Sequence, residues 1–218
     1  MSLSLLFRDE LNGFYRSKVM LVLWVGMPAL SVFIYLLSPD TGTIPVAVFT
    51  SFLVGSIGGT LSSAMLAVSI INERERHVFD LFVIRPVRRR NILLSKFLAV
   101  YLCVVVAGLL ALALGVLVDR FVTGLSGGFD LSGFASSTIV LLSMLAVSCS
   151  AGILIGTVSP SVLVGVILVL YGGNQLSSVA LLPVLLLEAD IWFPLIPGVA
   201  ISAALLAVSI VVFDRKQL

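Results

Sequence analysis

Long apolar segments alternate with short polar ones along this chain. A helix crosses the hydrocarbon layer of a membrane with roughly 20 apolar residues. Six segments meet this requirement, at 19–37, 45–71, 91–118, 134–157, 162–182 and 195–213. Polar or charged stops follow them, such as Ser38-Pro39-Asp40 after the first. The pattern predicts an all-α integral membrane protein in which six transmembrane helices form a single domain, 1–218.

The composition agrees with a membrane protein. Of the 218 residues, 60% are apolar and 11% are charged, whereas a soluble domain carries about 25% charged residues. Cys103 and Cys149 both fall inside apolar segments, so we expect small buried side chains rather than a disulfide. The first 18 residues mix both signs of charge with apolar residues, which is not the pattern of a signal peptide.

Basic residues predict the orientation in the membrane. If the N-terminus is cytoplasmic, twelve of the 13 lysines and arginines lie on the cytoplasmic side. Arg120 alone then lies outside. Cytoplasmic loops of membrane proteins carry an excess of basic residues. We therefore expect a multi-pass protein of the plasma or inner membrane with both termini in the cytoplasm.

The charged residues also narrow the function classes. The central parts of the six apolar segments contain no Asp, Glu, Lys, Arg or His. Ion-coupled carriers and membrane-embedded enzymes need ionisable groups at that depth, so both classes are disfavoured. The chain has no GxxxxGK[ST] loop and is therefore not expected to hydrolyse ATP by that route.

The loop between the second and third apolar segments is the most informative stretch. It reads NERERHVFDLFVIRPVRRRNILLSK from Asn72 to Lys96. A short helix is predicted from Glu73 to Ile84, with Glu73 and Glu75 in its first turn, where the helix dipole favours acidic residues. Pro86 would end it. Two interpretations remain: a helix resting on anionic lipid, or a docking helix whose alternating charges meet a protein partner.

This loop resembles that of the membrane subunit of ABC-2 type transporters. The family pattern has Glu-basic-Glu, an acidic residue, a leucine-rich stretch, Pro-Val, a basic residue and Ile-Leu-x-x-Lys. The matching positions are Glu73-Arg74-Glu75, Asp80, Leu81-Phe82, Pro86-Val87, Arg89, Ile92-Leu93 and Lys96. The chain departs from the pattern at His77 and Val78, where Gly-Thr is usual.

The resemblance implies a permease subunit of an ATP-driven exporter, in which 73–90 forms a coupling-helix loop. Two such subunits, identical or different, would pair and bind two copies of a cytoplasmic ATPase. ATP and Mg would be held by that ATPase, so no cofactor is expected in this chain. Membrane lipid is a further partner, and nucleic acid is not. The segment 1–18 resembles the family's amphipathic interface helix, and 182–197 resembles its short re-entrant outer helices.

The resemblance also implies roles for individual residues. Contacts with the ATPase are expected from Glu73, Arg74, Glu75, Arg76, Phe79, Asp80, Leu81 and Phe82. Loop geometry and anchoring to headgroups are expected from Pro86, Arg88, Arg89, Arg90 and Lys96. Catalytic and metal-binding residues are not expected.

Two further sets of residues stand out. Gly55, Gly59 and Ser63 lie four apart, which allows close helix packing, within the subunit or at a dimer seam. Asn174 and Gln175 follow two glycines and fit either a substrate path or a bond to backbone freed by those glycines. The alternative functions are a non-transporting membrane anchor of an assembly or sensing complex, and an ATPase-independent carrier.

Overall fold

A computed structural model describes residues 3–37, 46–76, 89–123, 131–179 and 195–215. All regular structure in these ranges is helical. The helices are α1 (Leu3–Tyr15), α2 (Lys18–Leu37), α3 (Val46–Glu75), α5 (Arg89–Thr123), α6 (Leu131–Val158), α7 (Val162–Leu168), the π-helical turn η1 (Val169–Gly173), α8 (Asn174–Val179) and α10 (Leu195–Arg215). The prediction of an all-α fold is confirmed.

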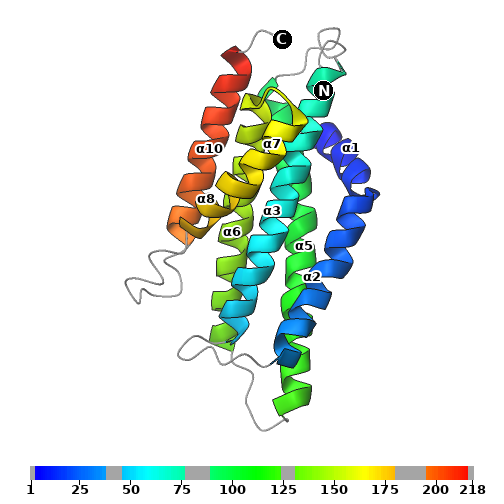
Figure 1. The fold of residues 1–218 in the computed structure, drawn as a ribbon, viewed down its shortest axis with the longest axis vertical. Helices are drawn as coiled ribbons and strands as arrows, with labels where there is room; N and C mark the ends of the chain where they lie inside the picture. The colour runs from blue at the N-terminus through cyan, green and yellow to red at the C-terminus, as the bar shows by residue number, and fades with distance from the viewer. Residues whose placement is uncertain (1–2, 38–45, 77–88, 124–130, 180–194, 216–218) are drawn as a thin grey trace.

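The long helices run roughly parallel to one another in a bundle (Figure 1). Helix α6 forms the centre of the bundle, where it contacts α3, α5 and α10. Of its most apolar 18-residue stretch, 78% is buried. Helix α10 packs against α6 at the edge of the bundle. Only 17% of the most apolar 18-residue stretch of α10 is buried. Helices α1 and α2 pack on α5 at the other side of the bundle. Many apolar residues of α10 and α2, such as Val25 and Val199, are therefore left to face lipid.

Within the described ranges, four helices are long and apolar enough to cross a membrane, namely α3, α5, α6 and α10. Helices α1 and α2 make a fifth candidate only as a pair, and they are bent by 69° at residues 16–17. The prediction of a multi-pass membrane protein agrees with these helices. The particular arrangement of six spans stays a prediction.

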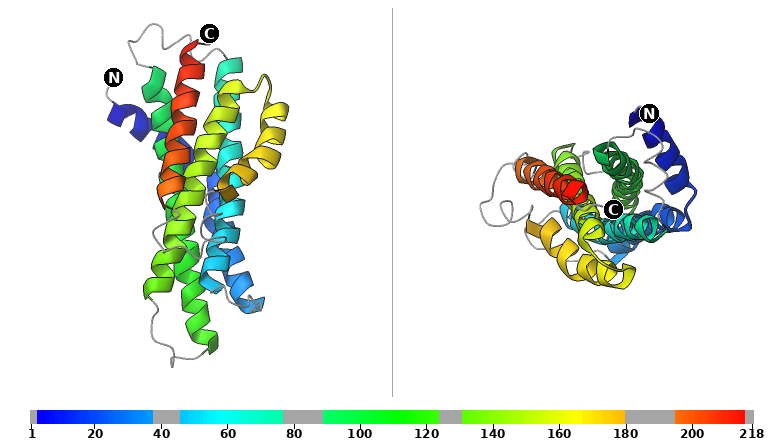
Figure 2. Two further views of the ribbon diagram at one scale, coloured as in Figure 1. Left: turned by 90° about the vertical axis from the view of Figure 1, so that its left-hand side faces the viewer. Right: turned by 90° about the horizontal axis from the view of Figure 1, so that it is seen from above.

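The fifth predicted span, 162–182, is the least regular part of the bundle. Its apolar portion in the structure, Val162–Gly173, is shorter than a full span. The backbone passes from α7 through the π-helical turn η1 before α8 begins. Figure 2 shows this segment inclined to α6 rather than parallel to it. The i→i+5 hydrogen bonds of a π-helical turn interrupt the regular α-helix, where a uniform apolar pattern predicts a continuous α-helix.

The stripe of small residues on α3 lies against α6. A Cβ atom on Gly59 would stand 2.9 Å from Cβ of Ser148. Conversely, a Cβ on Gly152 of α6 would stand 2.6 Å from Cα of Ser63. Gly55 faces α6 in the same way. The backbones of the two central helices approach closely because these side chains are small or absent, and this contact lies within the subunit.

The boundaries around the charged loop differ from those predicted. Helix α3 continues through Glu75, so Glu73 and Glu75 lie in its last turn and not in the first turn of a separate helix. Ion pairs and hydrogen bonds made by Glu73 and Arg74 hold this end of α3. Most of the predicted coupling helix, residues 77–88, and most of the predicted outer helices, residues 180–194, lie outside the described residues.

Candidate functional site

Lys96 lies in the second turn of α5 and is almost completely buried, with 1% of its surface exposed. Its neighbours Ile92, Leu93 and Phe97 are buried apolar residues, so this face of α5 turns into the bundle. A buried ammonium group costs several kcal/mol unless opposite charges and hydrogen bonds surround it. Lys96 therefore needs acidic partners from neighbouring helices.

Two carboxylates meet this lysine, and they come from two other helices. The Nζ atom of Lys96 lies 2.8 Å from Oε1 of Glu10 in α1 and 2.5 Å from Oε1 of Glu73 in α3. The Oγ atom of Ser69 donates to Oε1 of Glu73 at 3.3 Å. The ring of Phe14 lies below the ammonium, with its centroid 5.7 Å from Nζ. We call Glu10, Phe14, Ser69, Glu73 and Lys96 the Lys96 cluster.

The Lys96 cluster holds more acid than base. One ammonium group faces two carboxylates, so the fully ionised cluster carries one net negative charge. Burial raises the pKa of Glu10 above its ordinary value of 4.5, and the carboxylates of Glu73 and Asp9 add to this effect. The ammonium of Lys96 opposes it. Glu10 therefore takes up a proton more readily in the folded protein than a free glutamate does.

The Lys96 cluster lies at the base of the charged loop. Glu73 precedes residues 77–88 and Lys96 follows them, so one ion pair joins the two helices that flank the loop. The guanidinium of Arg74 donates a hydrogen bond to the backbone carbonyl of Ser159, in the turn between α6 and α7. The end of α3 that precedes the loop is therefore attached to α5, through Lys96 to α1, and to the turn between α6 and α7. Figure 1 shows α1, the end of α3, the start of α5 and the end of α10 at one end of the bundle.

The predicted docking residues divide into two groups. Glu75 and Arg76 are exposed at the end of α3. Glu73 and Arg74 direct their charged groups into the subunit. The remaining predicted docking residues, Phe79, Asp80, Leu81 and Phe82, lie outside the described part of the chain, as do Pro86 and Arg88.

One predicted role is corrected by the geometry. The family resemblance predicts that Lys96 anchors to lipid headgroups together with the loop arginines. Its ammonium group instead points into the bundle, because Glu10 and Glu73 neutralise it there. Arg90, by contrast, is exposed at the start of α5. Arg89 begins the same helix, but its side chain is not among those that the structure describes.

Glu10 is the functional residue that the sequence patterns missed. Its position in a segment of mixed charge gave no sign of its partner. The signal lay in α5: a single lysine within the apolar sequence ILLSKFLAV requires an acidic partner if that face is buried. Asp9 and Glu10, the two acidic residues of the predicted interface helix, are candidates for this partner.

The residues proposed for a substrate path are not brought into a described cavity. Gln175 is exposed on α8, and its backbone carbonyl accepts a hydrogen bond from Ser178. The side chain of Asn174 is outside the described part. Across the ranges that the structure covers, no group of three or more His, Cys, Asp or Glu side chains is placed to hold a metal ion.

The fold and this site define a multi-pass helical membrane protein with a charged cluster at the base of one loop. A family model for ABC-2 family transporter proteins matches residues 7–186, which includes the entire Lys96 cluster. The chain therefore belongs to the ABC-2 family of transporter membrane proteins. A search of curated proteins finds no match to this chain.

Proposed function

We propose that this chain is the permease subunit of an ATP-driven exporter and that a separate cytoplasmic ATPase docks on the loop between α3 and α5. Two permease subunits and two ATPase subunits would form the complex. Family membership over residues 7–186 supports the permease assignment. The Lys96 cluster supports the coupling role, because it joins both sides of this loop to α1.

The orientation proposed for the complex places the loop and both termini in the cytoplasm. The N-terminal helix, the ends of α3 and α10, and the start of α5 lie at the same end of the bundle (Figure 1). Exposed basic residues at this end include Arg8, Arg76, Arg90 and Arg215. An excess of basic residues on one side is typical of the cytoplasmic side.

The proposed mechanism is movement of a rigid unit. Contacts with the ATPase are assigned to the exposed Glu75 and Arg76 and, from the family resemblance, to residues 79–82. Glu73 and Lys96 are assigned a positioning role: they hold α1, α3 and α5 together at the base of the loop. A displacement of the loop on ATP binding would then move these three helices together, as in other rigid-body transitions between two states.

Copurification of the full chain from the membranes of its natural host tests this proposal. The expected result is a soluble protein with Walker motifs that copurifies with the wild-type chain. The Glu75→Ala, Arg76→Ala double variant should recover at least tenfold less of it, because the exposed charges are lost while the fold is retained. Gln175→Ala, an exposed change on α8, is the matched control and should recover the wild-type amount.

Two results would favour the alternatives. If no ATPase copurifies with any variant, an ATPase-independent carrier fits better. If a non-ATPase assembly copurifies instead, the chain is a membrane anchor of that assembly. Equal recovery of ATPase by the double variant and the control would remove Glu75 and Arg76 from the docking site.

A further inference from the structure

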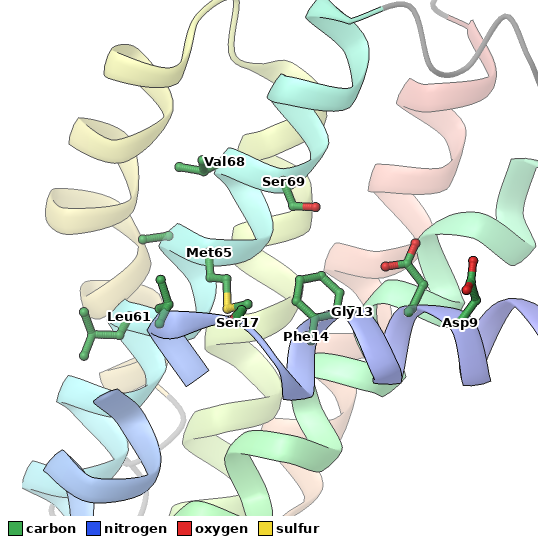
Figure 3. Close-up of a pocket in the computed structure, with 11 residues that line it drawn as sticks. Asp9, Gly13, Phe14, Ser17, Leu61, Met65, Val68 and Ser69 are labelled. Carbon is green, nitrogen blue, oxygen red and sulfur yellow. The ribbon is translucent and has the colours of Figure 1, made fainter. Parts of the chain in front are cut away.

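A cavity of about 570 Å³ lies between α1, the start of α2 and the second half of α3. Its volume falls within the range of small-molecule sites, about 300–1,000 Å³. Figure 3 shows α1 along one side, from Asp9 to Ser17, and α3 along the other, from Leu61 to Ser69. All residues that line this cavity belong to this chain, so the inference below does not rest on the proposed ATPase partner.

The wall formed by α3 is apolar over most of its length. Leu61, Ala64, Met65 and Val68 line it at the spacing of one helix face and lead to Ser69. Leu61 is near the middle of α3 and Ser69 is closer to the loop end. The wall therefore extends from the depth of the hydrocarbon layer towards the headgroups.

The cavity is bordered by surface that faces lipid. Leu61 on α3 is 42% exposed and Val19 at the start of α2 is 45% exposed. Exposed apolar side chains at this depth in a membrane protein contact acyl chains, because water is absent there. A lipid acyl chain can thus enter the cavity from the side without crossing a polar surface.

Acidic groups line the α1 side of the cavity. Asp9 and Glu10 line it, and Asp9 is exposed. Glu10 shares the single ammonium of Lys96 with Glu73, so this pair of carboxylates is only half neutralised. These carboxylates favour a cationic group on the α1 side of the cavity. A ligand that fits both features has an apolar chain and a headgroup that ends in a cationic group.

We propose that this cavity binds a phospholipid with a primary-amine headgroup from the membrane leaflet adjacent to α1. One acyl chain lies along Leu61, Ala64, Met65 and Val68, and the ammonium group lies at Asp9 and Glu10. A primary ammonium donates hydrogen bonds to carboxylates, and such charge-assisted bonds are roughly twice as strong as neutral ones. A quaternary ammonium headgroup of the same charge has no N–H to donate.

Reconstitution of the full chain in nanodiscs tests this proposal. The probe is phosphatidylethanolamine that carries a photoactivatable group on one acyl chain, at a few per cent of total lipid. The same group on phosphatidylcholine and on phosphatidylglycerol provides two comparisons. Peptide mass spectrometry after irradiation locates the adducts. We expect adducts within residues 61–69 of α3, with phosphatidylethanolamine exceeding each of the other lipids several-fold.

Two pairs of variants separate the headgroup from the acyl chain. Asp9→Asn should reduce labelling by phosphatidylethanolamine roughly 1.4- to 5-fold, the usual range for one exposed charge pair. Glu75→Gln removes one exposed acidic charge at the same end but outside the cavity, and should have no effect. Ala64→Phe should abolish labelling of residues 61–69 by filling the apolar wall, whereas Val25→Phe, on the exposed face of α2, should not.

Three results would overturn the proposal. Preferential labelling by phosphatidylglycerol would assign the surface to an anionic lipid held by Arg16 and Lys18, which flank the cavity residue Ser17. Equal labelling by all three lipids would show an ordinary contact with the bilayer. Absence of labelling at residues 61–69, in a sample that cross-links to a second copy through the same residues, would assign the cavity to a subunit interface.

Discussion

Two helix junctions in this molecule use opposite kinds of chemistry. At the junction of α3 and α6, backbones meet through Gly59, Ser63 and Gly152. At the junction of α1, α3 and α5, helices meet through a buried lysine and two carboxylates. Close packing has one good arrangement and resists displacement. An ion cluster with surplus acid can gain a proton or exchange partners, so it is better suited to a part that responds to a signal.

The comparison predicts that a substitution at the uncharged junction of α3 and α6 lowers the free energy of unfolding more than one at the charged junction. Replacing Gly152 by Leu places a side chain where a Cβ alone would stand 2.6 Å from Cα of Ser63. The neighbour is backbone and cannot turn away, so we expect a loss of about 3 kcal/mol or more in the free energy of unfolding. Denaturant unfolding in detergent, followed by circular dichroism, measures this change.

Gly26→Leu on α2 is the matched control. A Cβ on Gly26 meets nothing within 4 Å, and leucine favours a helix more than glycine does. This variant should be as stable as the wild type or slightly more so. If both variants unfold alike, the close contact between α3 and α6 is not a source of stability.

The charged junction should tolerate the loss of its lysine better. Lys96→Met leaves Glu10 and Glu73 without their shared cation, and removal of one partner from a fully buried pair costs about 3–5 kcal/mol. The two carboxylate side chains are 24% and 26% exposed, however, so hydration and protonation reduce the penalty. We expect a loss of about 2 kcal/mol in the free energy of unfolding, which is less than for a fully buried pair because solvent screens partly exposed charges.

A double-mutant cycle separates the ion pairs from simple packing. Adding Glu10→Gln to Lys96→Met should restore part of the lost stability, because one uncompensated carboxylate is removed. Strictly additive effects of the two changes would mean that Glu10 and Lys96 do not interact in the membrane.

The two junctions also differ in how well the sequence predicts them. The sequence predicts close packing at Gly55, Gly59 and Ser63, because a spacing of four residues places them on one face of a single helix. It does not predict which helix packs against that face. The Lys96 cluster combines residues 10, 73 and 96, which no local period connects. From its position in the sequence alone, Lys96 fits a headgroup anchor as well as it fits a buried partner of two carboxylates. Only the direction in which α5 faces the bundle distinguishes the two roles.

The irregular parts follow the same logic. The apolar content of 162–182 predicts a span, yet hydropathy contains no information on the π-helical turn at Val169–Gly173. Likewise, the polar residues that begin at Asn72 suggest a helix boundary. Helix α3 continues to Glu75 because Ser69 and Lys96 supply partners for Glu73 in its last turn, and Arg74 of the same turn bonds to the carbonyl of Ser159.

The smallest expected effect concerns Glu10 and pH. The pKa of Glu10 in the folded protein is raised above 4.5, mainly by burial, so the folded state binds a proton more readily than the unfolded state. The contribution of Glu10 to stability is therefore fully present below pH 4.5 and is lost as pH rises through its folded-state pKa. Once ionised, the carboxylate contributes little net stability, and Glu10→Gln should lie within about 1 kcal/mol of the wild type.

The difference between wild type and Glu10→Gln isolates this group from Glu73, Asp9 and Lys96, the charged groups that surround it. Unfolding of both proteins between pH 4.5 and 8 should show that the wild type loses stability relative to the variant as pH increases. The opposite slope would mean that Lys96 outweighs burial and that Glu10 stays ionised throughout. In that case the charged junction would be as fixed as the contact between α3 and α6, and the idea that it responds to a signal by gaining a proton would lose its physical basis.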